Sequence, residues 1–313
     1  MPLIFWIYFW IAIAAVAVLL YRKYIPKKLN VKGKNFVITG ASSGLGLAIA
    51  QLALDGGAAK VTLIARGEKG LQDAAASLKH TDDQEIQLLT ADVTNEDSVK
   101  GAFEQIDKID FLFPNAGFAL PAMFEDTTVD SMKRHINVNY LGAATTTKYA
   151  APKMNPGSHV SYSGSVCSLI SFSGYAAYSP SKYALRGLAD TLRNELKSQG
   201  ISAHIAFCSS MDTPGFKKEN EVKPASCAAI EGTAHTFTPR MIAEKIFRGI
   251  ALGDYIIVME PLVWFISAMG CGITQQNNIF LELLVAPFLP VIRFGSKVYI
   301  DLLGRKKTKA KTD

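Results

Sequence analysis

The sequence predicts an α/β fold built on a doubly wound parallel sheet of seven strands. Short apolar runs alternate with stretches of helical periodicity, and a helix fills nearly every gap between two strands. This alternation is typical of a parallel sheet that helices cover on both faces. With 313 residues and 49% apolar content, the chain is long enough to bury one large core, and no internal repeat or low-complexity linker divides it.

The elements can be placed in order along the chain. Apolar runs predict strands at Asn35–Thr39, Lys60–Ala65, Ile86–Ala91, Ile109–Pro114, His159–Ser163, Ile201–Cys208 and Tyr255–Met259. Helical periodicity predicts helices at Leu45–Leu54, Leu71–Leu78, Ser98–Ile106, Val129–Tyr149, Tyr183–Lys197 and Pro239–Ala251. We therefore assign residues 34–260 to a single domain.

The positive charge of the chain lies at the two ends of this domain. The formal net charge is +6, but residues 22–34 hold six basic side chains and residues 305–313 hold five, which leaves 22 basic and 26 acidic residues elsewhere. A domain that is slightly acidic lacks the basic face that nucleic-acid binding needs, so we expect no nucleic-acid partner.

Cysteine and histidine spacing argues against disulfides and metal. The four cysteines (Cys167, Cys208, Cys227 and Cys271) form no C-x-x-C pair, and the five histidines show no H-x-x-x-H spacing. We expect no bound metal and reduced thiols, as in a domain that faces the cytosol. Cys167, two residues after Ser165, is either a redox-active thiol or a buried inert one.

The first residues predict a membrane anchor. Pro2–Tyr21 is a run of twenty residues without a charged side chain. As a helix it would extend about 30 Å, the thickness of the hydrocarbon core of a bilayer. The run has no basic residues before it and ends in bulky side chains, unlike a cleaved signal peptide. We predict a transmembrane helix over residues 1–21, a basic linker over residues 22–33, and the domain on the cytoplasmic side.

The C-terminal region is apolar but interrupted. Pro261–Ile273 and Ile279–Ile292 are each short for a membrane span, and Gln275–Asn278 separates them. Residues 261–303 therefore either dip into the membrane interface beside the substrate entrance, or cover the sheet or a dimer contact. A basic cytoplasmic tail follows at residues 304–313. Its end, Lys309-Ala-Lys-Thr-Asp313, resembles an endoplasmic-reticulum retrieval signal, although a solvated tail is the alternative.

A glycine-rich turn joins the first strand to the first helix. It reads Thr39-Gly-Ala-Ser-Ser-Gly-Leu-Gly46, and Gly40, Ser42, Ser43, Gly44, Leu45 and Gly46 are the candidate contacts. Glycines let the backbone approach a pyrophosphate, and the amino end of the following helix stabilises its charge. The second strand ends at Ala65-Arg66, with no acid until Glu68. An arginine there suits a 2′-phosphate, so we expect NADPH rather than NADH.

Tyr178 and Lys182 are the candidate catalytic pair. They are four residues apart in Tyr178-Ser-Pro-Ser-Lys182, and on a helix that spacing puts both side chains on one face. Ser165 lies thirteen residues upstream. A nearby cation lowers the pKa of a tyrosine, so we expect Lys182 to make Tyr178 usable for proton transfer near neutral pH. The same spacing occurs at Tyr24/Lys28 and Tyr149/Lys153, but neither pair has the upstream serine.

These motifs together resemble the short-chain dehydrogenase/reductase family over residues 34–259. The resemblance implies a Rossmann-type fold with Ser165, Tyr178, Lys182 and Asn139 as catalytic residues. It further implies that Lys182 holds the nicotinamide ribose, Tyr178 protonates the substrate carbonyl, Ser165 orients it, and Asn139 supports a water-mediated proton relay. Its other implied cofactor contacts are Asp92, Val93, Asn115, Ala116, Gly117 and Thr213. The chain departs from the family where Cys208-Ser209 replaces the Pro-Gly pair before Thr213.

The loop after the sixth strand indicates a substrate. Asp212-Thr-Pro-Gly-Phe216, continuing to Pro224, resembles the corresponding loop of 3-ketodihydrosphingosine reductases, although an ordinary surface loop is the alternative. This resemblance implies NADPH-dependent reduction of 3-ketosphinganine to sphinganine at the endoplasmic-reticulum membrane, with the catalytic domain facing the cytosol. Asp212 and Glu219 are the candidates for binding the substrate amine. A homodimer is a further expectation from the family.

Three other functions fit the same sequence. One is a membrane-bound reductase of the same family that acts on 3-ketoacyl-CoA, a retinoid or a steroid. Another is a non-catalytic NADPH-sensing or scaffold protein, which the presence of Ser165, Tyr178 and Lys182 together argues against. The last is a membrane-remodelling protein that uses the apolar ends of the chain. Turnover of a carbonyl with NADPH distinguishes the first from the other two.

Overall fold

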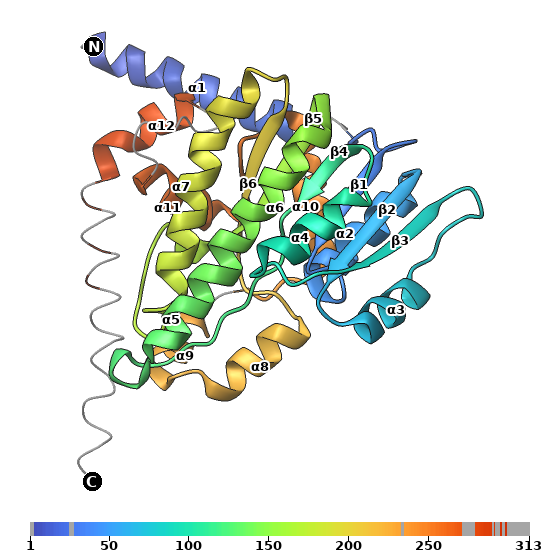
Figure 1. Cartoon of the computed structure of the whole chain (residues 1–313). Coiled ribbons are helices and arrows are strands. Elements are labelled where there is room, and N and C mark those ends of the chain that lie inside the picture. Colours follow the sequence, from blue (N-terminus) through green and yellow to red (C-terminus); the bar gives the residue numbers. More distant parts are fainter. Residues whose placement is uncertain are drawn as a thin grey trace.

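The computed structural model describes residues 3–24, 28–232, 235–270 and 279–289, together with residues 291, 295 and 298. In this part of the chain, seven strands form one sheet in the order β3-β2-β1-β4-β5-β6-β7, and all neighbouring strands are parallel (Figure 1). The predicted doubly wound sheet is therefore confirmed. The strands are β1 (Asn35–Thr39), β2 (Lys60–Ala65), β3 (Glu85–Thr90), β4 (Ile109–Phe113), β5 (Met154–Ser165), β6 (Ser202–Cys208) and β7 (Ile256–Val258).

Helices cover the two faces of the sheet (Figure 1). On one face lie α2 (Gly44–Asp55), α3 (Glu68–Ser77) and α10 (Pro239–Leu252), and on the other lie α4 (Glu96–Glu104), α6 (Gly142–Ala150) and α7 (Tyr178–Lys197). Successive residues of a strand point to opposite faces, so each strand supplies both cores. In β1, Phe36 and Ile38 pack under α2 while Val37 belongs to the opposite core.

The order of the strands reverses beside β1. From β1 the chain moves outward to β2 and β3, and then returns to place β4 on the other side of β1. The turns that follow β1 and β4 therefore run to opposite faces of the sheet, which opens a crevice at the carboxyl ends of these strands. The sequence places the glycine turn at the first of these ends and Asn115 at the second.

The predicted helices differ from the observed ones by a few residues at their ends, and two differ more. The helix predicted from Tyr183 begins at Tyr178, so Tyr178 and Lys182 lie on the same helix. The helix predicted over Val129–Tyr149 is divided into α5 (Val129–Ile136) and α6 by a π-turn at Asn137–Leu141. In this wider turn the backbone N–H of Gly142 donates to the carbonyl of Asn137. The extra residue is not visible in the apolar periodicity, and the π-turn contains Asn139.

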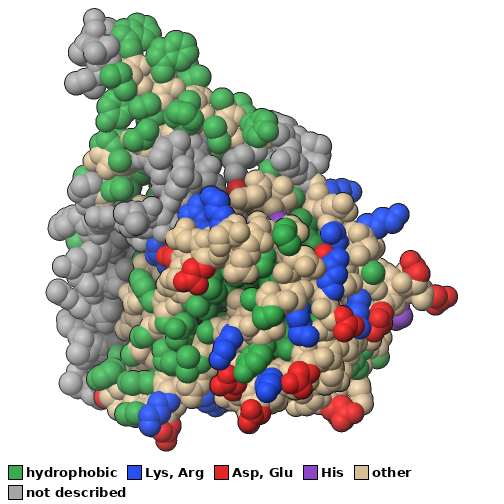
Figure 2. Space-filling view, turned by 45° about the horizontal axis from the view of Figure 1, so that its top comes forward, with side chains coloured by type: hydrophobic (Ala, Val, Ile, Leu, Met, Phe, Trp, Pro, Cys, Tyr) green, Lys and Arg blue, Asp and Glu red, His purple; other side chains and the backbone are tan. Residues whose placement is uncertain are grey.

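The N-terminal residues form α1 (Leu3–Tyr24), which projects from the sheet and lies next to α12 (Ile279–Val285) (Figure 1). Large apolar side chains are exposed along it, as Figure 2 shows: Trp6, Ile7, Phe9, Trp10, Ile13, Val16, Leu19 and Leu20. Among the residues that the structure describes, however, no helix is both long enough and apolar enough to cross a membrane. The transmembrane part of the fold prediction, made for residues 1–21, is therefore not supported.

Part of the region 261–303 can be described. Residues Pro261–Gly270 form α11, which packs against β7 and buries Val263 in one of the two cores. After α12, a 3₁₀ turn follows at Ala286–Phe288. The Gln275–Asn278 separator, the tail at residues 304–313 and its possible retrieval signal lie outside the described residues, as do residues 25–27 of the basic linker.

Candidate active site

A cavity of about 1430 Å³ lies at the carboxyl ends of the strands. It brings together most of the residues that the sequence marks as a site. The predicted residues that line it are Gly40, Ser42, Ser43, Gly44, Leu45, Arg66, Asp92, Val93, Asn115, Ala116, Gly117, Ser165, Tyr178, Lys182 and Thr213. Two others, Gly46 and Asn139, lie behind its wall and are buried.

The glycine turn has no room for larger residues. Gly40 and Gly44 adopt positive φ angles of 66° and 57°, which favour glycine. A Cβ atom at Gly46 would lie 2.4 Å from the carbonyl oxygen of Gly40, so the helix can approach the turn only without a side chain. Ser43 precedes α2, and no side-chain hydrogen bond from within the described chain caps that end of the helix. The open helix end and the side-chain-free turn fit a dinucleotide pyrophosphate.

Asn115 fastens the ends of three neighbouring strands. Its backbone N–H donates to Thr39 Oγ1 at 3.0 Å, and its side-chain Nδ2 donates to the carbonyl oxygens of Thr39 and Gly40 at 3.3 and 3.4 Å. Ser163 Oγ in turn donates to Asn115 Oδ1 at 2.8 Å. The Asn-Ala-Gly turn is thereby held over β1, β4 and β5, and it forms a fixed floor for the cavity.

Arg66 and Asp92 lie at the side of the cavity next to β2 and β3. Asp92 Oδ1 accepts hydrogen bonds from the backbone N–H and the hydroxyl of Thr94, at 2.9 and 2.8 Å. Partial burial opposes ionisation of Asp92, but these hydrogen bonds and the charge of Arg66 hold its pKa below the ordinary value. Arg66 itself is exposed at the end of β2, where an anionic group could approach it.

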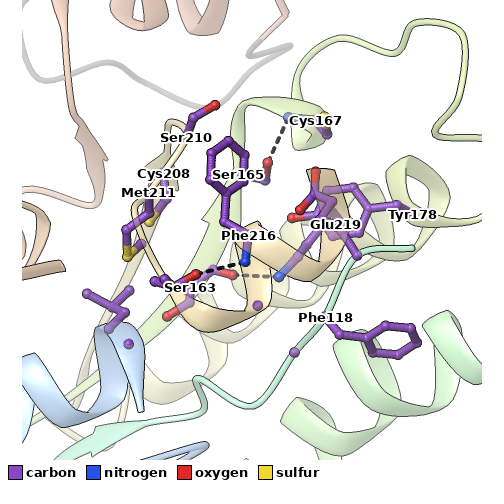
Figure 3. Close-up of a pocket in the computed structure, with 18 of the residues that line it drawn as sticks. Phe118, Ser163, Ser165, Cys167, Tyr178, Cys208, Ser210, Met211, Phe216 and Glu219 are labelled. Carbon is purple, nitrogen blue, oxygen red and sulfur yellow. Dashed lines mark hydrogen bonds between the residues drawn. The ribbon is translucent and has the colours of Figure 1, made fainter. Parts of the chain in front are cut away.

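Tyr178 and Lys182 face the cavity from the first turn of α7 (Figure 3 labels Tyr178). Lys182 Nζ donates to the carbonyl oxygen of Ser163 at 2.9 Å and lies 5.7 Å from the centre of the Tyr178 ring. Burial lowers the pKa of Lys182 to about 8. Burial also raises the pKa of Tyr178 well above its ordinary value, although the neighbouring Ser165 side chain partly offsets the rise.

The expectation that Lys182 lowers the pKa of Tyr178 is therefore wrong for this structure. Removing the phenolate from water disfavours ionisation, and the charge of Glu219 opposes it further. The phenol stays protonated at neutral pH, which is the form a proton donor needs.

Ser165 ends β5 and turns its hydroxyl to the same cavity. The backbone N–H of Cys167 donates to Ser165 Oγ at 3.1 Å, and the N–H of Ser165 donates to Ser168 Oγ at 3.2 Å. These reciprocal bonds fix the strand end and the direction of the serine. Burial raises the pKa of Cys167 to about 12, so its thiol stays neutral and the redox-active alternative is disfavoured.

Asn139 holds the cavity wall from behind. Its Oδ1 accepts from the backbone N–H of Phe118 at 2.9 Å, and its Nδ2 donates to the carbonyl of Phe118 and to Ser181 Oγ, both at 3.0 Å. Gly117 separates it from the cavity, since a Cβ atom there would lie 3.0 Å from Asn139 Oδ1. Asn139 thus links the segment after β4 to α7, and its role in a water-mediated relay stays a prediction.

The loop after β6 covers the glycine turn. Thr213 Oγ1 accepts from the backbone N–H of Phe216 at 3.0 Å and caps α8 (Pro214–Val222). Its methyl group would lie 3.0 Å from a Cβ atom at Gly44, so the loop packs directly on the turn. Where the family has Pro-Gly, Ser209 instead donates to Glu260 Oε1 at 2.6 Å. This bond ties the loop to the residue that precedes α11.

Sequence reasoning missed a charged network on the side of the cavity opposite the glycine turn. The Tyr175 hydroxyl donates to Glu219 Oε1 at 2.5 Å and also contacts Glu231 at the end of α9 (Ala225–Glu231). Lys223 Nζ donates to Glu231 and lies 3.3 Å from Glu219 Oε1. Tyr175 precedes α7, and the sequence signals for this network are its closeness to Tyr178 and the i,i+4 spacing of Glu219 and Lys223 on α8. In the described chain, no group of three or more His, Cys, Asp or Glu side chains could hold a metal ion.

Comparisons with known proteins place the chain among oxidoreductases. The profile of the family described as short chain dehydrogenase matches residues 34–224. A 3-ketodihydrosphingosine reductase of Dictyostelium discoideum is 32% identical over 316 residues, which cover 93% of each chain. A 3-dehydrosphinganine reductase of Danio rerio is 33% identical over 264 residues, 81% of this chain and 79% of that protein.

A solved structure gives the same fold. A short-chain dehydrogenase from Burkholderia cenocepacia J2315, in complex with NADP, superposes with a TM-score of 0.63 and 23% identity. The match covers 73% of this chain and 97% of that one.

Proposed function

This chain belongs to the short-chain dehydrogenase family, and on that premise we propose that it reduces 3-ketosphinganine to sphinganine with NADPH. The observation that carries the proposal is the placement of Ser165, Tyr178 and Lys182 in one cavity with the glycine turn. A carbonyl in that cavity meets a proton donor and a hydroxyl that can orient it. The names of the relatives from Dictyostelium discoideum and Danio rerio support the choice of ketone.

The residues of the cavity suit NADPH. The glycine turn and the amino end of α2 would hold the pyrophosphate, and Arg66 would pair with the 2′-phosphate that distinguishes NADPH from NADH. Lys182 would hold the nicotinamide ribose. The other contacts are assigned to Asp92, Val93, Asn115, Ala116, Gly117 and Thr213. When bound, NADPH supplies the hydride that reduces the carbonyl carbon.

Tyr178 donates the proton in this scheme. Its raised pKa keeps the phenol protonated at neutral pH, so the hydroxyl can deliver a proton to the carbonyl oxygen. Ser165, fixed at the end of β5, donates a hydrogen bond to the same oxygen and orients it. Asn139 acts through Phe118 by keeping the wall next to the ketone in place. The protein therefore contributes orientation and a proton.

A further part of the cavity wall, formed by α11, suits an alkyl chain. Residues of α11 line it with apolar side chains, namely Leu262, Val263, Phe265 and Ile266, and Phe172 adds an aromatic ring. Apolar walls of this kind bury lipid chains, while a few polar groups fix the orientation of the head. A long-chain amino ketone meets both needs.

The site of action in this proposal is the endoplasmic-reticulum membrane, with the catalytic domain on the cytosolic side. The exposed apolar side chains of α1 support an association with lipid, because a surface of that kind is costly to leave in water. Working at the membrane would give the enzyme a substrate that is poorly soluble in water. A homodimer is also part of the proposal, and crosslinking in detergent tests it.

The first experiment is a substrate panel with the full-length chain in microsomes. NADPH oxidation would be followed with 3-ketosphinganine, a 3-ketoacyl-CoA and retinal, each repeated with NADH. We expect turnover of 3-ketosphinganine with NADPH and much slower turnover with NADH. If another carbonyl compound is reduced faster, the proposed substrate is wrong, but the assignment to the family still holds. If NADPH binds but no carbonyl is reduced, the proposed reductase activity is wrong, and a role as an NADPH sensor or scaffold gains support.

A further inference from the structure

The ketone named in the proposed function carries an amino group on the carbon next to its carbonyl. When protonated, this group is a cation close to the oxygen that Tyr178 would protonate. An enzyme that selects an amino ketone over a plain ketone gains from an anionic side chain at that place. The inference below rests on the proposed function and concerns which residue supplies the anion.

Two carboxylates line the cavity beside Tyr178, and both belong to the network around Tyr175. Glu219 of α8 and Glu231 of α9 are among its lining residues. The ring of Tyr175 lies 5.4 Å from the ring of Tyr178, and its hydroxyl bonds to Glu219. The charge of Glu219 also acts on the phenol of Tyr178, and Figure 3 shows the two side chains next to each other.

The other sequence candidate, Asp212, is placed differently. Its side chain is 61% exposed and pairs with Lys217 at 3.7 Å. Asp212 is not among the residues that line the cavity. Of the two acids that the sequence offered for the amine, only Glu219 therefore has access to the reacting ketone.

One carboxylate oxygen of Glu219, Oε2, is available to accept a hydrogen bond. Tyr175 and Lys223 both contact its Oε1, while the two oxygens of Glu231 are divided between the same partners. Within the described residues, no hydrogen bond or ion pair reaches Oε2 of Glu219. The side chain of Glu219 is only 13% exposed, so this free acceptor has little access to bulk water.

The charges of the network also leave room for one cation. Two carboxylates share Lys223, which is the single cation within ion-pair distance of them in the part of the chain that is described. Burial raises the pKa of Glu219, and the charge of Glu231 adds to the rise, while Tyr175 and Lys223 oppose it. One further positive group would relieve the repulsion between the two acids.

We infer that Glu219 is a specificity residue that binds the amino group of the substrate through its free oxygen. Tyr175, Lys223 and Glu231 position its carboxylate, and the tyrosine ring places it beside the phenol of Tyr178. The ketone and the amine are then held by adjoining parts of one wall. This arrangement favours a 2-amino-3-ketone over a ketone that lacks the amine.

The test compares two substrates in the full-length protein. Wild type, Glu219→Gln and Glu221→Gln would be assayed with 3-ketosphinganine and with the matching 1-hydroxy-3-ketone that lacks the amine. Glu221 lies on the same helix but is exposed and outside the cavity lining, so it controls for a change of charge on α8. The readout is the ratio of kcat/KM for the amino ketone to kcat/KM for the plain ketone.

We expect this ratio to fall about 10- to 100-fold in Glu219→Gln, the range for one hydrogen bond to a charged group, and to stay at the wild-type value in Glu221→Gln. An unchanged ratio in Glu219→Gln would overturn the inference. So would an equal loss on both substrates, since that marks a structural role. Wild type that reduces neither ketone would instead refute the proposed function, and the inference would fall with it.

Discussion

The two halves of the cavity are built in different ways. The strand-turn half consists of the loops after β1, β2, β3 and β4, and its wall is mostly backbone: glycines at positive φ and an asparagine that bonds to main-chain carbonyls. The helical half consists of α8, α9 and Tyr175, and its wall is held by contacts between charged side chains. A cofactor shared by a whole family can be bound by backbone geometry, whereas a particular substrate is selected by side chains.

Tyr178 lies where the two halves meet, and replacing it should have the largest effect. Tyr178→Phe removes the hydroxyl that we propose as proton donor and keeps the ring, so kcat for the ketone should fall about 100- to 10,000-fold while NADPH still binds. NADPH oxidation and a binding titration measure the two properties. Tyr149→Phe is the matched control, because Tyr149 has the same spacing to a lysine but is hydrogen-bonded to Glu96 at the surface. Activity that survives in Tyr178→Phe would show that the proton comes from elsewhere.

A larger side chain in the glycine turn should weaken the binding of NADPH to the strand-turn half. In Gly46→Ala the new Cβ atom meets the carbonyl oxygen of Gly40 at 2.4 Å, so the turn must move. We expect NADPH affinity to fall by at least about tenfold, which corresponds to roughly 1.4 kcal/mol. Titration of nicotinamide fluorescence measures it. Gly187→Ala, at an open position of α7, is the control and should bind normally. Tight binding by Gly46→Ala would mean that the turn is not the rigid wall described above.

Arg66 is the side chain of the strand-turn half that should select NADPH over NADH. Arg66→Ala should lower the preference for NADPH over NADH by about tenfold, since the proposed charge-assisted contact to the 2′-phosphate would be lost. The ratio of kcat/KM for the two cofactors is the measurement. Lys69→Ala removes a charge that is also exposed, from the start of α3, and should leave the ratio unchanged. If Arg66→Ala keeps the preference, the cofactor assignment needs another anchor.

Lys182 should have the smallest and most pH-dependent effect, on stability. Its pKa is about 8 in the folded protein, against an ordinary value of 10.5, so the unfolded chain binds more protons between these pH values. Because of this residue, the free energy of unfolding should rise as the pH increases from about 8 to 10.5. At pH 7 the buried charge of Lys182 destabilises the folded protein. Lys182→Met should melt a few degrees higher than wild type at pH 7, and the difference should shrink by pH 9. Melting curves at both pH values test the sign, and a lower melting temperature at pH 7 would contradict it.

The strand-turn half could be predicted almost completely from the sequence, because its parts are local. The glycine turn occupies eight consecutive residues. Tyr178 and Lys182, where the two halves meet, were predictable for the same reason, because they are one helical turn apart. The seven strands were also predictable, since each is a short apolar run between helical patterns. In these places the residues that meet in space are also close in the sequence, so their spacing predicts their arrangement.

The helical half could not be predicted in the same way. Tyr175 is 44 residues from Glu219 and 56 from Glu231, and no spacing rule connects such positions. The pKa of Tyr178 was expected in the wrong direction because burial depends on how distant segments pack. The π-turn could not be predicted because the apolar periodicity of residues 129–149 continues through it. The anchor predicted for residues 1–21 rested on composition, and the described helices do not support a span.

The π-turn at Asn137–Leu141 sets a rule for insertions and deletions. Each residue of an α-helix turns the chain by about 100°, and a π-turn contains one residue more than the regular helix needs. Deleting one residue there would restore an ordinary helix and would swing Asn139 away from the backbone of Phe118. We therefore expect a one-residue deletion between α5 and α6 to break the two hydrogen bonds between Asn139 and Phe118.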